Sequence, residues 1–340
     1  MGERKIIINS RAPVRISFGG GGTDVDPFCK EHGGAVISAA INRYAYSSLE
    51  VSDKYVFKSG NFDCDLEFDK IEDMDYDGNL DLIKSIVKHY NKKDKYKIFL
   101  DVEAPPRSGL GSSASAFASV IGLFNHMKQH ERITDYEVAE LAYNLEREEL
   151  KNAGGRQDQY AAVFGGLNYI EFKGDNFVRV NPLKLKKEYE LELEKNLLLV
   201  HIGSRKDSGD IIGDQNKNYE KGKNKDPLFQ TKEIMDKMKY SLLRGELDEF
   251  GNLLDKAWKL KKQFSKMVSN SEIDKIYDTA LNNGALGGKI TGAGGGGHML
   301  FYCPGNTKND VLKELLKLGV THVPFNFDYE GLVTWEIKNE

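Results

Sequence analysis

The chain has 340 residues, of which 40% are hydrophobic and 29% are charged, and its formal net charge at pH 7 is −4. This length predicts one large α/β unit or two closely associated lobes, and the mixed charge gives no electrostatic case for binding nucleic acid or a membrane. The N-terminal residues lack the apolar core of a signal peptide, and no run reaches the roughly 18 apolar residues of a membrane-spanning helix. The three cysteines are widely spaced, which favours free, buried thiols and a cytoplasmic protein.

The first 70 residues predict β-strands, because their apolar or alternating runs are separated in places by glycine clusters. Thr134 and Glu137 have the spacing of a capping box, which predicts the start of a helix. The elements expected after residue 70 are a helix over 80–92, a strand over 96–103, and helices over 112–128 and 134–151.

Short strands return after residue 165, and an apolar strand is expected over 196–203. The polar segment 213–227, GDQNKNYEKGKNKDP, predicts a mobile segment or the edge of a lid. The remaining expected elements are helices over most of 229–283, two strands around a glycine loop over 284–303, a helix over 308–318 and two final strands.

Glycine gathers in three clusters, at 19–22, 109–111 and 292–297, each beside apolar strand or helix patterns. Two of them match a dinucleotide-binding fingerprint, but the context argues against it. The match at 292–297 is followed by a strand, and the match at 109–114 follows Pro105-Pro106 and lacks the acidic residue expected about 20 residues later. The P-loop pattern also fails around Lys289, so neither nucleotide motif explains the glycines.

The stretch 105–115, PPRSGLGSSAS, lies between an apolar strand pattern and a helical pattern. The first amides of a helix lack partners and carry a partial positive charge, so phosphate binds well there. Ser112, Ser113 and Ser115 add hydroxyls that bond phosphate oxygens or reach Mg²⁺, although a serine in this position also caps helices. The run as a whole therefore predicts a phosphate-binding loop.

The same stretch resembles the central ATP-binding motif of the GHMP small-molecule kinases. The segment 13–24, PVRISFGGGGTD, resembles the first motif of that family, and 289–297, KITGAGGGG, resembles the third. The three motifs occur in the family's order and the resemblance covers nearly the whole chain. Within the family, RISFGGGGTD and GGRQDQYAAVFGGLNYIEF most resemble the D-glycero-D-manno-heptose 7-phosphate kinases.

This resemblance implies an α+β fold of two lobes with the active site in the cleft between them. The lobes would span 1–190, with the ATP- and sugar-binding motifs, and 191–340. The implied reaction is transfer of phosphate from ATP, with Mg²⁺, to the anomeric hydroxyl of a heptose 7-phosphate, for nucleotide-heptose and surface-glycan synthesis. A homodimer is compatible with the resemblance.

The catalytic residues implied by the resemblance are Asp158, which accepts or orients the proton of the attacking hydroxyl, and Arg15, the cation beside it. Mg²⁺ prefers hard oxygen ligands, and the resemblance implies Glu146 with a serine, taken as Ser113 although Ser112 stays open. Glu148 and Glu149 are rival carboxylates on the same helical pattern.

The ATP site implied by the resemblance consists of Pro106, Ser108, Gly109, Leu110, Gly111, Ser112, Ser113, Ala114 and Ser115. The implied substrate site consists of Gly20, Gly21, Gly22, Thr23, Asp24, Arg205, Gly294 and Gly295. Galactokinases have a Glu-His pair where this chain has Gly21 and Gly22, which opens space for a larger sugar phosphate. The phosphate of that substrate has several candidate partners: Arg205, Lys206, Ser208, Arg107 and Arg156.

Two alternatives remain open from the sequence. One is a GHMP kinase for another acceptor, such as fucose, a related hexose, mevalonate or phosphomevalonate. The other is a non-catalytic sensor that binds ATP and a sugar, against which Arg15, Glu146 and Asp158 argue.

Overall fold

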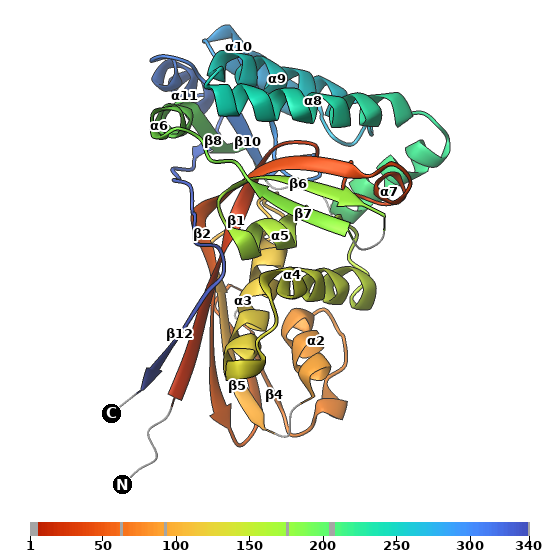
Figure 1. Cartoon of the computed structure of the whole chain (residues 1–340), viewed down its shortest axis with the longest axis vertical. Helices are drawn as coiled ribbons and strands as arrows, with labels where there is room; N and C mark the ends of the chain where they lie inside the picture. The colour runs from red at the N-terminus through yellow and green to blue at the C-terminus, as the bar shows by residue number, and fades with distance from the viewer. Residues whose placement is uncertain (1–5, 62–63, 92–93, 175–176, 204–207, 339–340) are drawn as a thin grey trace.

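The computed structural model describes residues 6–61, 64–91, 94–174, 177–203 and 208–338. Two β-sheets organise these residues. The larger sheet has the strand order β12-β1-β2-β5-β3-β4, with β6 and β7 attached to β2, and the smaller one has the order β11-β8-β10-β9. Figure 1 shows the larger sheet running through the lower half of the molecule, with the smaller sheet and its helices above it.

Two long antiparallel strands dominate the larger sheet: β1 (Ile6–Gly19) and β2 (Gly34–Ser52). At about 3.3 Å per residue, the 19 residues of β2 extend roughly 60 Å. Each replaces two shorter strands expected from the sequence, and register shifts at Pro13/Val14 and Ser17/Gly19 mark irregular pairing within the β1–β2 ladder. The other strands of this sheet are β3 (Tyr55–Ser59), β4 (Cys64–Phe68), β5 (Lys95–Val102), β6 (Leu167–Lys173), β7 (Phe177–Pro182) and β12 (Val333–Lys338).

Helices cover one face of the lower half of this sheet (Figure 1). The central one, α3, is buried along most of its length, because Ala, Val, Leu and Phe occupy nearly all of its faces. Phe124 of α3 stacks on Tyr90 with 4.7 Å between ring centroids, which joins α3 to α2. The helical elements on this side are α2 (Asp81–Tyr90), α3 (Ser112–Met127), α4 (Asp135–Tyr143), α5 (Gln157–Phe164), the 3-10 turns η1 (Ile71–Asp73) and η2 (Gln129–Glu131), and the π-helical turn η3 (Asn144–Glu149).

A second hydrophobic core joins the two sheets. Val14, Ile16 and Phe18 of β1 pack with apolar residues of α8, α9 and β8, so this half of β1 is buried on both faces. The elements of the upper part are α6 (Lys187–Asn196), α7 (Ser208–Glu220), α8 (Lys225–Arg244), α9 (Leu247–Lys261), α10 (Ser271–Asn282), α11 (Lys308–Leu316), β8 (Leu197–His201), β9 (Gly287–Ile290), β10 (His298–Tyr302) and β11 (Thr321–His322), and α1 (Phe28–His32) follows β1.

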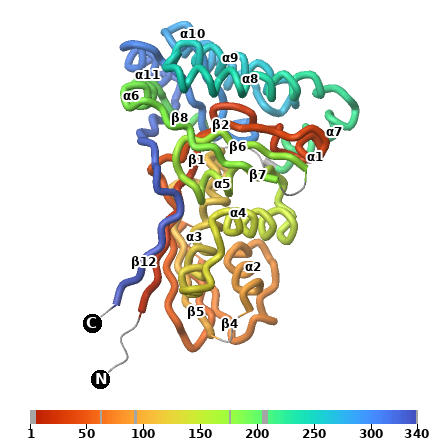
Figure 2. Tube along the Cα trace, in the orientation of Figure 1, coloured from red at the N-terminus to blue at the C-terminus, as the bar shows by residue number. Residues whose placement is uncertain are grey.

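The last strand returns to the first one. β12 pairs antiparallel with β1, with Ile6 opposite Lys338, so the two described ends of the chain lie together (Figure 2). The predicted lobe boundaries, 1–190 and 191–340, stay a prediction, and the larger sheet takes a strand from the second of these ranges. None of the helices within the described residues is both long enough and apolar enough to cross a membrane.

The prediction of a mobile segment at 213–227 is wrong. Helix α7 continues to Glu220 and α8 begins at Lys225. The polar composition misled because these side chains are bonded inside the protein: Asn224 donates from Nδ2 to the carbonyl oxygens of Gln215 and Phe264, at 2.9 and 3.0 Å. Tyr219 also packs its ring against Phe28, 5.8 Å away.

The capping box predicted at Thr134 is confirmed. The Thr134 hydroxyl accepts from the Glu137 amide at 3.4 Å, and the Glu137 carboxylate accepts from the Thr134 amide at 2.7 Å. The helix is shorter than expected, because α4 ends at Tyr143 and the π-helical turn η3 follows.

Replacing Thr134 with alanine removes this cap, so Thr134→Ala is expected to lower the free energy of unfolding by about 1 kcal/mol. Chemical denaturation of both proteins measures the change. Thr279→Ala is the matched control, because its hydroxyl bonds only within its own helix, to the Lys275 carbonyl, and the expected change is below about 0.5 kcal/mol. Equal stabilities of the two variants would refute the role of the cap.

Candidate active site

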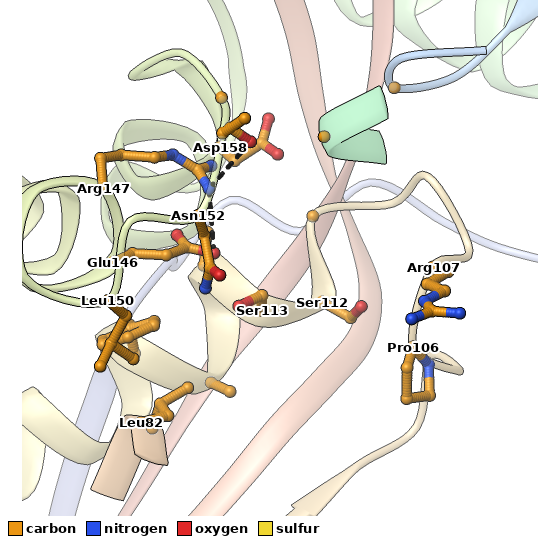
Figure 3. Close-up of a pocket in the computed structure, with 18 of the residues that line it drawn as sticks. Leu82, Pro106, Arg107, Ser112, Ser113, Glu146, Arg147, Leu150, Asn152 and Asp158 are labelled. Carbon is orange, nitrogen blue, oxygen red and sulfur yellow. Dashed lines mark hydrogen bonds and ion pairs between the residues drawn. The ribbon is translucent and has the colours of Figure 1, made fainter. Parts of the chain in front are cut away.

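A cavity of about 890 Å³ lies between the two parts of the molecule. Its walls come from the β1–β2 loop, the segment before α3, the start of α3, η3 and the segment after it, α7, α9 and the glycine loop after β9. Figure 3 shows part of it, with Ser112 and Ser113 in the centre, Glu146 and Asp158 to their left and Pro106 and Arg107 to their right. All three glycine clusters predicted from the sequence contribute to this cavity.

The loop before α3 adopts a shape that requires glycine. Gly109 and Gly111 have φ of +81° and +77°, a region that other residues rarely adopt. A Cβ on Gly109 would lie 2.5 Å from the carbonyl oxygen of Thr291. The loop before α3 therefore packs against the end of β9, directly before the third glycine cluster. Among the described residues no side chain caps α3, and its first turn faces the cavity at Ser112, Ser113 and Ala114, which suits an anionic oxygen.

Arg15 and Asp158 form an ion pair at this loop. Arg15 donates from Nε and Nη2 to the same oxygen, Oδ1 of Asp158, at 2.9 and 2.6 Å. Its Nη1 donates to the carbonyl oxygen of Gly109 at 2.6 Å, and its backbone amide donates to Leu110 at 2.9 Å. Arg15 is only 2% exposed, so this ion pair is largely shielded from solvent on the arginine side.

Glu146 is held by a buried amide. It lies in η3, is 2% exposed, and its Oε2 accepts from Nε2 of Gln159 at 2.6 Å, while Oε1 lies 3.3 Å from Arg147. Of its two rivals, Glu148 has a side chain 67% exposed and does not line the cavity. Glu149 does line the cavity, but it is exposed and accepts a hydrogen bond from the Tyr76 hydroxyl. Among the three, the π-helical turn thus buries only the carboxylate of Glu146 in the cavity wall.

A hard-cation site fits this arrangement. Mg²⁺ in phosphate sites needs only one or two protein oxygens, because phosphate oxygens and water complete its coordination. Glu146 and Ser113 supply a carboxylate and a hydroxyl on the same cavity wall (Figure 3). Within the described residues no group of three or more His, Cys, Asp or Glu side chains is positioned to hold a metal alone, so a metal here would share its ligands with phosphate.

Asp24 forms another wall of the cavity. It is 2% exposed and accepts from the Gly22 amide at 3.0 Å and from Nε2 of Gln157 at 3.0 Å. Burial and, second, the negative charge of Asp158 raise the pKa of Asp24 above its ordinary value. Gly155 packs so closely that a Cβ there would lie 2.2 Å from Oδ2 of Asp24. A buried carboxylate of this kind suits a ligand that donates hydroxyl hydrogens.

Apolar side chains line part of the cavity. Leu82, Val102, Pro106 and Leu150 are among them (Leu82, Pro106 and Leu150 are labelled in Figure 3). Apolar walls with a few polar groups are typical of sites for organic ligands. The cavity therefore offers apolar surface, an anion-binding helix start and a carboxylate wall in one space.

The structure brings many of the predicted site residues together and places others behind them. The predicted residues that line the cavity are Arg15, Gly21, Gly22, Asp24, Pro106, Gly109, Gly111, Ser112, Ser113, Ala114, Glu146 and Asp158. Gly20, Thr23, Ser108, Leu110, Ser115, Gly294 and Gly295 are outside this lining. Ser115, for example, donates its hydroxyl to the Pro13 carbonyl at 2.7 Å. Arg205 lies outside the described residues.

Some lining residues were missed from the sequence. Gln157, Gln215 and Lys261 all line the cavity. Gln157 stands next to Asp158, which is a signal that could have been used. Lys261 lies within a helical pattern rich in lysine, and Gln215 lies in the polar segment 213–227, so no local signal distinguishes either residue. In the third glycine cluster, Gly292 and Ala293 line the cavity instead of the predicted Gly294 and Gly295.

Comparison with known proteins agrees with the fold. The chain matches the GHMP kinases N terminal domain over residues 81–166 and the GHMP kinases C terminal domain over residues 238–321. It is 35% identical over 337 residues to the D-glycero-alpha-D-manno-heptose 7-phosphate kinase of Campylobacter jejuni, covering 97% of this chain and 99% of the relative. It is 30% identical to a mevalonate kinase of Methanocaldococcus jannaschii over 69% of this chain and 71% of that protein.

Solved structures show the same fold over nearly the whole chain. A D-glycero-D-manno-heptose 1-phosphate kinase from Bacteriodes thetaiotaomicron superposes with a TM-score of 0.81 at 30% identity, covering 97% of this chain and 99% of that one. A putative sugar kinase from Campylobacter jejuni gives a TM-score of 0.79 at 34% identity, with 97% and 98% covered. This chain belongs to the GHMP kinase family. It is a phosphotransferase with an alcohol group as acceptor, and kinases of this family take the phosphoryl group from ATP.

The three cysteines lead to a prediction about thiol reactivity. Cys29 and Cys303 are free and buried, and burial raises the pKa of each to about 12. At pH 8 their thiolate fraction is therefore about 10⁻⁴. Cys64 is half-buried and lines the cavity, so a thiol reagent at pH 8 is expected to modify Cys64 in the folded protein and to leave the other two intact.

Peptide mass spectrometry after timed labelling measures this pattern. Denatured protein, in which all three thiols react, is the control. ADP is expected to slow the labelling of Cys64 by occupying the cavity. Rapid labelling of Cys29 or Cys303 in folded protein would contradict the burial described above.

Proposed function

We propose that this GHMP kinase transfers the γ-phosphoryl group of ATP to the anomeric hydroxyl, at C1, of D-glycero-D-manno-heptose 7-phosphate. The observation that carries the transfer chemistry is the buried Arg15–Asp158 pair in the cavity that also contains the start of α3. The choice of acceptor is supported by 35% identity, over 97% of this chain, to a protein named for the heptose 7-phosphate. The product would be the 1,7-bisphosphate, an activated sugar for nucleotide-heptose and surface-glycan synthesis.

Asp158 would receive the proton of the attacking hydroxyl. Both hydrogen bonds from the Arg15 side chain to Asp158 end on Oδ1, which leaves Oδ2 to accept from the acceptor. The hydroxyl oxygen then bonds to the γ-phosphorus, and the bond from that phosphorus to the leaving oxygen of ADP breaks. An anomeric hydroxyl is more acidic than an ordinary alcohol, so a carboxylate with a modest proton affinity is sufficient.

The loop and the start of α3 would bind the phosphates. The amides of the first turn and the hydroxyls of Ser112 and Ser113 face the cavity, where they neutralise negative charge on the transferring group. Glu146 and Ser113 would hold Mg²⁺, which neutralises charge on the phosphate oxygens when it is bound. Arg15 would keep Asp158 oriented and add positive charge next to the reacting phosphorus.

Asp24 and Gln157 would orient the sugar. The Asp24 carboxylate accepts from protein amides and lies on the cavity wall, so a sugar hydroxyl that donates to it would fix the ring. Holding the acceptor in one orientation converts the transfer into a step within one complex, which is the main source of rate for phosphoryl transfer.

Replacing Asp158 with asparagine keeps its size and removes its capacity to take a proton. Asp158→Asn is expected to lower kcat by roughly 10²- to 10⁴-fold, measured as ADP release in a coupled assay. Asp278→Asn, at an exposed position of α10, is the matched control and should keep full activity. If Asp158→Asn binds ATP and retains more than a tenth of the wild-type kcat, Asp158 is not the catalytic base.

The acceptor is tested by ADP release with D-glycero-D-manno-heptose 7-phosphate, mannose, fucose, galactose and mevalonate, each with ATP and Mg²⁺. Strong turnover is expected only with the heptose phosphate, because the relative with 35% identity is named for it. ³¹P NMR of the product should show a phosphate coupled to the anomeric proton, which identifies C1. Turnover with a neutral sugar or mevalonate alone would replace the proposed acceptor, and ligand binding without turnover of any acceptor would favour the sensor.

A further inference from the structure

A lysine from the upper part of the molecule reaches the carboxylate wall of the cavity. Lys261 is the last residue of α9, is only 6% exposed, and lines the cavity together with Gly21 and Gly22. A Cβ placed on Gly21 would lie 3.9 Å from Nζ of Lys261. The ammonium group is therefore close to the predicted sugar-binding loop. Because residue 21 is glycine, no side chain from this position lies between the loop and the ammonium group.

Other polar atoms surround the same point. The Cβ position of Gly21 lies 3.4 Å from Nε2 of Gln157 and 3.9 Å from Oγ of Ser17. Gln157 Nε2 donates to Asp24, which fixes the amide orientation, and neither Oε1 of Gln157 nor Oγ of Ser17 has a hydrogen-bond partner among the described residues. Buried polar atoms without partners are costly, so this wall is suited to a polar ligand.

Other basic side chains lie near Lys261. Lys289 is buried and donates to the carbonyl oxygens of Ser17 and Ile290, at 2.8 and 2.9 Å. Burial, and then the charges of Lys261 and Arg15, lower the pKa of Lys289 well below its ordinary value. Since those two charges act on Lys289, Lys261 and Arg15 both lie close to it, and a ligand beside Lys261 is surrounded by basic groups, which favours an anion.

We propose that Lys261 binds the phosphate group that the acceptor sugar already carries and thereby selects a phosphorylated sugar over a neutral one. This inference rests on the proposed function, whose acceptor has a phosphate at C7. A desolvated ammonium forms strong, charge-assisted bonds to phosphate oxygens. The neighbours of Lys261 are Gly21 and Gln157 of the sugar wall, whereas the Gly109–Gly111 loop, which would hold ATP, contacts Thr291, Arg15 and Asp158.

Lys261→Met keeps the length and apolar stem of the side chain and removes the charge. With wild-type protein active on the heptose 7-phosphate, the variant is expected to raise KM for that acceptor roughly 10- to 100-fold, as loss of a charged hydrogen bond does. KM for ATP and for the same heptose without its phosphate should stay within about twofold of the wild-type values. The reason is that the substitution removes binding energy only from the phosphate group of the acceptor. Lys261→Arg should recover part of the affinity.

The matched control is Lys256→Met, at an exposed position of the same helix. It removes the same charge outside the cavity and should leave all three KM values unchanged. Thermal unfolding of each variant shows whether it is folded.

Three results would overturn the role of Lys261. The first is an equal rise in KM for both forms of the heptose, which would place Lys261 at the sugar ring. The second is a selective rise in KM for ATP, which would place it at the γ-phosphate. The third is no change in any of the three KM values.

Calorimetric binding of the heptose 7-phosphate without nucleotide separates this inference from the proposed function. Suppose that wild type binds the heptose 7-phosphate but releases no ADP in the assay with ATP. If Lys261→Met then binds this sugar phosphate at least tenfold more weakly, the proposed reaction fails and the phosphate site stands. If wild type turns the acceptor over and Lys261→Met binds it equally well, the reaction stands and the phosphate site fails. If wild type neither binds nor phosphorylates the heptose 7-phosphate, both are rejected.

Discussion

Three side-chain hydrogen bonds from Arg15 hold the centre of this molecule together. Two go to one oxygen of Asp158 at the start of α5, and the third goes to the carbonyl oxygen of Gly109 in the loop before α3. A buried arginine is costly unless its charge is paired and its N–H groups are bonded. The strand, the loop and the helix must therefore keep one relative position, and that position also sets the cavity walls.

Residues from the N-terminal and the C-terminal parts of the sequence form the cavity together, because the two sheets share a hydrophobic core. The upper half of β1 is covered on one side by α8 and α9, and its lower half packs against α3 and its neighbours. The same strand supplies Arg15 and leads directly to Gly21, Gly22 and Asp24. One continuous strand thus links the anion-binding helix start with the wall that would receive the sugar, and small changes in its register would affect both.

Many residues of the cavity could be predicted from the sequence because short segments of the chain form its phosphate-binding and glycine-rich parts. Glycine runs that need positive φ, a serine pair at a helix start, and an aspartate after two glycines are short-range signals. The capping box at Thr134 was predictable for the same reason. The fold class also followed, since the three motifs resemble those of one family.

The remaining features depend on contacts between distant segments. Lys261 lies in a helix with several other lysines, and only the packing of α9 against β1 brings its ammonium to Gly21. The polar residues of 213–227 look mobile in isolation, yet Gln215 and Asn224 are bonded inside the protein. Likewise, the change from α4 to the π-helical turn, which directs Glu146 toward Gln159, has no sequence signal of its own.

The pairing of β12 with β1 has a consequence for synthesis of the chain. β1 is synthesised before β12, the strand that covers its outer edge. Until β12 leaves the ribosome, the edge of β1 presents unpaired amides and carbonyls, which are a template for pairing with other chains. The larger sheet therefore stays open at this edge until almost all of the residues between β1 and β12 have been synthesised.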